Sequence, residues 1–119
     1  MNGSINKVIL IGNLGDDVKM HRFDNQNVLG RFPIATSESY FKKDTSERIT
    51  KTEWHTVVVR NRLAEVCEKY LTKGNKVYIE GSLKNRKWEE DGTTRYATEV
   101  HAEIVEFLTP KNSALEDGT

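Results

Sequence analysis

The stretch from Val77 to Trp88, VYIEGSLKNRKW, decides the fold because it alternates between two kinds of side chain. In a β-strand, successive residues point to opposite faces of the sheet. One face receives the apolar row Val77, Ile79, Gly81 and Leu83, which is typical of a core. The other face receives Tyr78, Glu80, Ser82, Lys84, Arg86 and Trp88. An exposed indole beside two cations suits single-stranded nucleic acid, because bases can stack on the ring while the cations neutralise phosphates.

Composition limits the classes of protein to which this chain can belong. Its 119 residues are enough for one domain with its own core. No apolar run reaches 18 residues and no secretory signal is visible, so we expect no membrane partner. The single cysteine, Cys67, excludes an intramolecular disulfide and a cysteine-based zinc site, and favours a reducing, cytoplasmic location. The 18 basic and 18 acidic residues cancel, which argues against a wholly polyanion-binding surface but permits a basic stripe.

Apolar patterning predicts five strands, over residues 5–14, 28–40, 53–60, 77–88 and 94–108. Asn61 is the expected N-cap of a short helix, which Lys73-Gly74 should terminate. Asp91-Gly92 predicts a tight hairpin turn. Residues 41–52 are polar, and we interpret them as a long hairpin loop.

Two details of the strands carry further expectations. Gly30 and Pro33 suggest a bulge or an unpaired edge, because proline cannot donate to a ladder. Val57-Val58-Val59 is apolar on both faces, so both should be covered, one by the core and the other by a partner subunit.

The order of three strands, one helix and two strands indicates an all-β oligonucleotide-binding (OB) fold. This fold is a five-stranded barrel, here with one short helix between strands 3 and 4. We expect the domain over residues 1–108, followed by a polar and disordered segment over 109–119.

Five stretches resemble the bacterial and mitochondrial single-stranded DNA-binding protein family in their order and spacing. They are residues 5–15, 35–40, 52–55, 63–74 and 77–88. The resemblance implies a non-enzymatic OB-fold protein, assembled as a homotetramer, that binds single-stranded DNA without sequence preference. It also implies a role in DNA replication, repair and recombination, in the cytoplasm and at the nucleoid.

The resemblance also implies roles for individual residues. Base-stacking platforms are expected at Tyr40, Trp54 and Trp88. Contacts to the DNA backbone are expected from Lys43, Arg62, Lys73, Lys84, Arg86, Lys87 and Arg95. The subunit interface is expected to include Asn6, Lys7, Val8, Ile9, His55 and Tyr78.

Some positions depart from the family's pattern. Tyr40 stands where many members carry tryptophan, and it keeps a smaller stacking face. Arg60 stands where a stacking phenylalanine is common, so it either contacts DNA through its guanidinium or is a solvated surface residue. Trp54 and Trp88 have the alternative of burial in the core or in an interface. The chain ends without the linker and acidic tip through which members recruit genome-maintenance proteins, which leaves such partners open.

The residues give no support to catalysis, to a metal or to a cofactor. His21, His55 and His101 lack ligand spacing, and Cys67 lies on the apolar side of the expected helix. Neither a Ser/His/Asp order nor a phosphate-binding glycine loop is present. Two alternatives remain, a protein-interaction module on the same fold and a small hydrolase on an antiparallel barrel. The hydrolase lacks the cluster of acids, bases or ligands that it would need.

Overall fold

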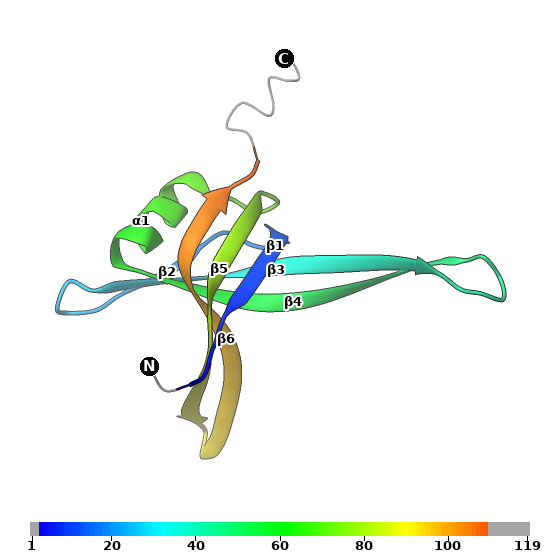
Figure 1. Cartoon of the computed structure of the whole chain (residues 1–119). Helices are drawn as coiled ribbons and strands as arrows, with labels where there is room; N and C mark the ends of the chain where they lie inside the picture. The colour runs from blue at the N-terminus through cyan, green and yellow to red at the C-terminus, as the bar shows by residue number, and fades with distance from the viewer. Residues whose placement is uncertain (1–2, 110–119) are drawn as a thin grey trace.

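A computed structural model describes residues 3–109 and shows six strands and one helix within them (Figure 1). The elements are β1 (Val8–Leu14), β2 (Lys19–Arg22), β3 (Val28–Phe41), β4 (Arg48–Arg60), α1 (Asn61–Tyr70), β5 (Lys76–Glu90) and β6 (Thr93–Phe107). The strands form one sheet in the order β1-β5-β6-β4-β3-β2, and a further pairing of β1 with β3 closes it into a barrel. The expected all-β barrel with a single short helix is confirmed.

The place of the helix in the strand count is corrected. Lys19–Arg22 forms a short strand at the edge of the sheet, paired only with β3, so α1 follows the fourth strand along the chain rather than the third. The other five strands close the barrel. The sequence leaves β2 ambiguous because its four residues, KMHR, are too few and too polar to show an alternating pattern.

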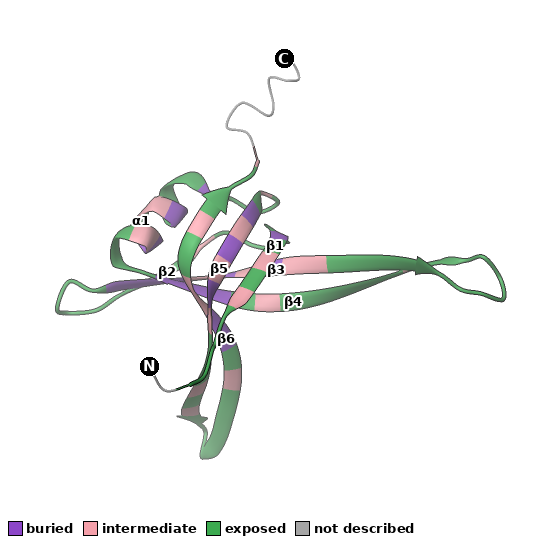
Figure 2. Ribbon diagram, in the orientation of Figure 1, coloured by how far each residue is buried: buried purple, intermediate pink, exposed green. Residues whose placement is uncertain are grey.

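The core lies inside the barrel and beneath α1, where the buried residues gather (Figure 2). The predicted apolar row holds at Val77, Ile79 and Gly81, all of which are buried. Helix α1 contributes Ala64 and Cys67, and burial raises the pKa of the Cys67 thiol to about 12. No helix within residues 3–109 is long and apolar enough to cross a membrane.

Leu83 does not join the core, contrary to the prediction, and its side chain is 47% exposed. The reason is that β1 pairs with β5 only between Val8–Gly81 and Asn13–Lys76. Beyond Gly81, β5 has only β6 as its partner and the two strands leave the barrel together as a hairpin (Figure 1). The predicted turn is present at its end, where Asp91 and Gly92 both have positive φ.

Half of the segment interpreted as a long loop, residues 41 and 48–52, is strand. β3 and β4 pair without interruption from Leu29–Arg60 to Phe41–Arg48, so the turn is confined to residues 42–47 and the strands form a projecting arm (Figure 1). Two cross-strand hydroxyl pairs, Ser37–Thr52 at 3.0 Å and Ser39–Thr50 at 3.1 Å, tie the arm together. Both faces of the arm are exposed to solvent, so its sequence is polar and lacks the apolar alternation that would predict a strand.

The predicted bulge lies elsewhere. β3 pairs with β4 without a register shift through Gly30 and Pro33, whereas β5 and β6 shift register between Glu80 and Gly81. A Cβ at Gly81 would lie 2.8 Å from the Cα of Ala102, so only glycine allows this close approach. Pro33 falls between the stretches of β3 that pair with β2 and with β1, where a missing N–H removes no ladder bond.

Two further expectations are also corrected. Val58 is buried by the chain itself, so covering the second face of β4 requires no partner subunit. Asn61 does not cap the helix with its side chain; instead its Oδ1 accepts a hydrogen bond from the N–H of Val28, the first residue of β3, at 3.0 Å. Pro110 to Thr119 lie outside the described residues, and so does nearly all of the segment expected to be disordered.

Candidate nucleic-acid interface

One outer face of the barrel collects residues from four strands. Arg31 lies opposite Val58, Val58 opposite His101, and His101 opposite Ser82, so these residues point the same way. Alternation along each strand adds every second residue. The resulting basic face consists of Arg31 on β3, Trp54 and Arg60 on β4, Lys84, Arg86 and Trp88 on β5, and Glu99 and His101 on β6.

Trp88 is held by a cation from its own strand. The guanidinium carbon of Arg86 lies 4.1 Å from the centre of the indole ring, within the range of a cation–π contact. The ring is half-buried, so Arg86 covers part of it and the remainder is accessible. Arg95 lies directly opposite Trp88 on β6 and pairs with Glu90 at 3.2 Å. The combination of ring and cations predicted at the end of this stretch is therefore present.

Trp54 is not a core residue, because its side chain is 61% exposed. The indole leans over Gly15, where an added Cβ would clash with ring atoms Cζ3 and Cη2. The absence of a side chain at Gly15 thus gives the ring a flat backbone surface to rest on. Burial of Trp54 within the domain, the alternative reading of the sequence, is wrong.

A buried carboxylate lies at the centre of the basic face. Glu99 is 2% exposed, and its Oε2 accepts hydrogen bonds from the Nε of Arg31 at 2.9 Å and of Arg86 at 3.0 Å. Burial by itself would raise the pKa of Glu99, but the hydrogen bond and charge of Arg31, followed by Arg86 and His101, outweigh it and hold the pKa below its usual value. The carboxylate therefore stays ionised and bridges two cations.

A hollow of about 440 Å³ opens beside this network. Arg60, Lys84 and His101 contribute to its lining from three adjacent strands, above Val58. Burial lowers the pKa of His101, although the nearby Glu99 opposes the shift. The lowered pKa favours the neutral imidazole of His101, and the cations that line the hollow are Arg60 and Lys84.

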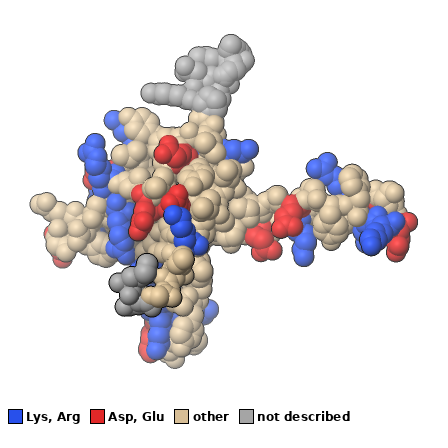
Figure 3. Space-filling view, viewed as in Figure 1, with Lys and Arg blue, Asp and Glu red and all other residues tan. Residues whose placement is uncertain are grey.

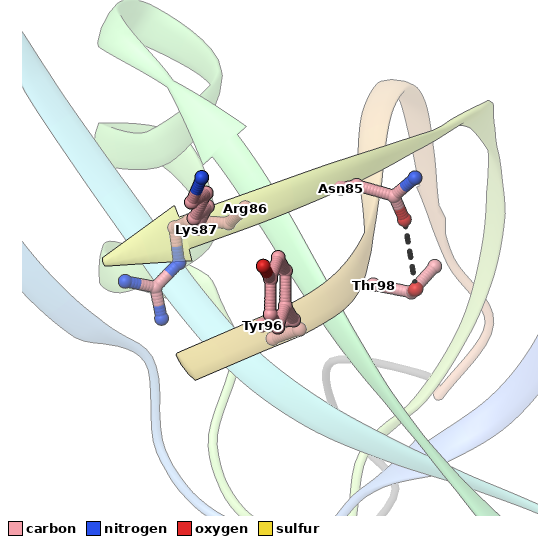
Figure 4. Close-up of a pocket in the computed structure, with 6 residues that line it drawn as sticks. Asn85, Arg86, Lys87, Tyr96 and Thr98 are labelled. Atoms are coloured by element: carbon pink, nitrogen blue, oxygen red, sulfur yellow. Dashed lines mark hydrogen bonds between the residues drawn. The ribbon is translucent and has the colours of Figure 1, made fainter. Parts of the chain in front are cut away.

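The structure places the other predicted DNA contacts away from the basic face. Tyr40 and Lys43 lie on the β3–β4 arm, with Lys43 in its turn. Lys87 points to the opposite side of the β5–β6 hairpin from Trp88, where its Nζ lies 5.9 Å from the ring of Tyr96 (Figure 4). Arg62 is the second residue of α1, and Lys73 follows the helix. Figure 3 shows basic and acidic side chains mixed along the arm rather than segregated.

The predicted subunit-interface residues fall into two groups. Lys7 pairs with Glu80 at 2.7 Å, and Glu80 also accepts a hydrogen bond from the Tyr78 hydroxyl at 2.9 Å. These contacts raise the pKa of Lys7 and of Tyr78 and lower that of Glu80. Ile9 lies opposite Glu80 and is exposed, so it shares this outer face.

The remaining three residues of the predicted interface make contacts within the subunit. The amide group of Asn6 forms two hydrogen bonds with the backbone of Leu83, at 2.8 and 2.9 Å. Val8 packs against the core. His55 bonds to the Thr36 hydroxyl at 2.9 Å and lies on the opposite side of β4 from Trp54.

Three residues with a place in this region were missed by sequence reasoning. Arg31 and Glu99 occupy the basic face. Phe41 is 68% exposed and points to the same side of the arm as Trp54. Trp54 lies opposite Ala35, and every second residue from Ala35 through Ser37 and Ser39 to Phe41 points to that side. Extending the alternation of residues 28–40 by one residue would have placed Phe41 on this side. No local signal identifies Glu99, because its partners lie 68 and 13 residues away.

Comparison with known proteins identifies the class to which this surface belongs. A profile of the Single-strand binding protein family matches residues 5–108. A single-stranded DNA-binding protein from Bacteroides thetaiotaomicron is 41% identical over 112 residues, which cover 92% of this chain and 70% of the relative.

Two solved structures share the fold. One is a Plasmodium falciparum SSB in complex with single-stranded DNA, with a TM-score of 0.79, 33% identity, and coverage of 91% of this chain and 99% of that one. The other is a deletion mutant of the single-stranded DNA binding protein from Thermus aquaticus, with a TM-score of 0.74 and 27% identity. That match covers 87% of this chain and 50% of the Thermus chain. Given this agreement of sequence, barrel and basic face, the chain belongs to the single-strand binding protein family, whose members are binding proteins rather than enzymes.

Proposed function

We propose that this protein binds single-stranded DNA without sequence preference and protects it during DNA replication, repair and recombination. The observation that carries the proposal is Trp88 with Arg86 stacked on its ring at 4.1 Å, on the same face as the exposed Trp54. A flat ring next to cations suits an unpaired nucleotide, because the base can stack on the ring while the phosphate pairs with a cation. We place the protein in the cytoplasm, at the nucleoid, and take residues 1–108 as its binding domain.

Affinity would have two physical sources. Trp54, Trp88 and, on the arm, Tyr40 act as platforms, each contributing about 1–3 kcal/mol per stacked base. Cations neutralise phosphates and release counterions, so log K falls with log[salt] by about 0.7 per phosphate contacted on a single strand. We assign these phosphate contacts to Lys43, Arg60, Arg62, Lys73, Lys84, Arg86, Lys87 and Arg95.

Assembly would extend the binding surface. Apolar Ile9 and Ile11 are exposed on β1, beside the Lys7–Glu80–Tyr78 cluster, and together with Asn6, Val8 and His55 we assign this region to the interface of a homotetramer. Several linked sites on one strand reinforce each other through effective concentration. A long strand would then wrap from one subunit to the next.

A fluorescence titration tests the proposal. Oligo(dT) should quench the emission of Trp54 and Trp88, whereas a duplex of the same length should bind far more weakly because pairing hides the faces of its bases. Repeating the titration at two salt concentrations separates the stacking contribution from the phosphate contribution. Equal affinity for single strands and duplex would contradict the proposal.

A further inference from the structure

We propose that Glu99 is a positioning residue for single-stranded DNA. Its buried carboxylate holds the guanidinium groups of Arg31 and Arg86 in the orientation in which they receive phosphates of a strand stacked on Trp88. This assignment rests on the proposed function and deepens it, because it adds Arg31 to the phosphate-contacting residues. It also gives a role to an acidic side chain in the middle of a surface that binds a polyanion.

The bridge joins two strands that do not pair with each other. In the sheet, β3 and β5 are separated by β4 and β6, and Glu99 on β6 reaches both. One oxygen, Oε2, accepts from the Nε of Arg31 and from the Nε of Arg86. Within residues 3–109 no hydrogen bond occupies the terminal nitrogens of either guanidinium. Those nitrogens are the donors that bind phosphate oxygens in pairs.

Exposure increases from the carboxylate to the two cations. The side chain of Glu99 is 2% exposed, whereas those of Arg31 and Arg86 are 33% and 40% exposed. An approaching phosphate therefore meets the guanidinium groups and not the carboxylate beneath them. Since Arg86 also stacks on Trp88, the same carboxylate fixes a cation and, through it, one side of the indole ring.

Preorganisation is the physical benefit of this arrangement. An arginine side chain in solvent samples many rotamers, and binding must restrict them. When Glu99 restricts them in the folded protein, less conformational entropy is lost as the strand binds. The order that the carboxylate imposes on the two arginines then outweighs its repulsion of the phosphates.

The proposal and simple electrostatics predict opposite signs. A negative charge near a polyanion repels it, so removing the charge of Glu99 should tighten DNA binding if charge alone mattered. If Glu99 positions Arg31 and Arg86, removing it should weaken binding, although the net charge of the surface becomes more positive. The sign of the change therefore separates the two explanations.

The test measures the affinity of the full chain for oligo(dT) at fixed salt. Glu99→Ala should weaken binding by about 5- to 20-fold, because two long side chains must then be ordered on binding. Glu99→Gln keeps the shape and one acceptor oxygen, so its loss should be smaller but in the same direction. The matched control is Glu89→Gln, an exposed carboxylate on the same hairpin that pairs with none of the assigned contacts, for which binding should stay equal or become tighter.

A second arm separates positioning from a general structural role. In an Arg31→Met, Arg86→Met background, Glu99→Gln should cause no further loss of affinity, because there is nothing left to position. A structural role would give the same loss in both backgrounds. In a Trp54→Phe background, Glu99→Gln should also change the emission of Trp88 before any DNA is added, since Arg86 no longer rests steadily on its ring.

The outcomes of this test are distinct. If the unmodified protein does not bind oligo(dT), the proposed function and this inference both fail. If it binds, and both Glu99 variants bind equally well or more tightly, only the positioning role is overturned. Weaker binding that disappears in the arginine-free background supports it.

Discussion

The two indoles of the basic face are presented to solvent in different ways. Trp88 is half-buried and carries Arg86 on one side, so its orientation is fixed before a strand arrives. Trp54 stands further out and rests on the backbone at Gly15. Both rings offer a face to a base, and the ring itself, rather than a hydrogen bond, should decide the affinity.

We predict that Trp88→Ala and Trp54→Ala each weaken oligo(dT) binding by about one to two decades at fixed salt, because each removes the ring on which one base stacks. Equilibrium titration of correctly assembled protein measures the loss. Trp88→Phe and Trp54→Phe are the matched controls, since they keep a flat ring and should retain most of the affinity. Unchanged binding by both alanine variants would refute the assignment of the platforms.

The side of the sheet to which a residue points could be predicted from the sequence where alternation along its own strand determined it. Parity placed Lys84, Arg86 and Trp88 on one side of residues 77–88, and the structure keeps them there. The bridge at Glu99 was not readable, because a carboxylate between two cations is defined by strands that meet only in the folded barrel. The exposure of Leu83 could not be predicted for the same reason, because it depends on where β1 stops pairing with β5.

The β3–β4 arm presents a different aromatic residue on each of its faces. Tyr40 lies opposite Ile49, and Phe41 lies opposite Arg48. Because neighbouring residues point to opposite faces, Phe41 continues the side of the arm on which Trp54 lies. Lys42 and Lys43 follow in the turn, so cations are close to this ring.

We predict that Phe41→Ala weakens the binding of strands long enough to reach the arm by about 5- to 100-fold, the value of one stacking platform. Short oligonucleotides that cover only Trp54 and Trp88 should bind as before. A length series of oligo(dT) measures the difference, with Phe23→Ala, an exposed phenylalanine outside the proposed surface, as the control. If the variant matches the unmodified protein at every length, the strand does not follow this side of the arm.

The elements that sequence reasoning recovered are those with one apolar and one polar face. Residues 48–52 of β4 and the whole of β2 were missed because neither segment buries a continuous apolar row, so periodicity could not identify them. Hydroxyl pairs and uninterrupted pairing with a neighbouring strand stabilise the arm instead. Asn61 was misassigned because its side chain bonds to β3 rather than to its own helix.

At the scale of the whole molecule, apolar surface remains uncovered on β1. Ile9 and Ile11 are 56% and 54% exposed, and they alternate with residues that face the core. Neighbouring isoleucines on an exposed strand favour association with another copy of the chain. This location agrees with the interface predicted from the family, although that prediction rested on resemblance rather than on pattern.

We predict that Ile9→Glu together with Ile11→Glu dissociates the tetramer without unfolding the barrel, because both side chains are already exposed while like charges would face each other across the interface. Light scattering at micromolar concentration measures the assembly, and circular dichroism reports the fold. Phe23→Glu, at an exposed phenylalanine outside the assigned interface, is the control and should leave the assembly unchanged. A monomeric unmodified protein would rule out the tetramer.

The position of Cys67 has a practical consequence for studying the contacts of the two hairpins. It is the only cysteine of the chain, it is fully buried on the core side of α1, and burial raises the pKa of its thiol to about 12. Alkylating dyes react with accessible thiolates, and this sulfur supplies neither the access nor the charge at neutral pH. A cysteine introduced at the tip of either hairpin would therefore take a label by itself, with the native background left intact.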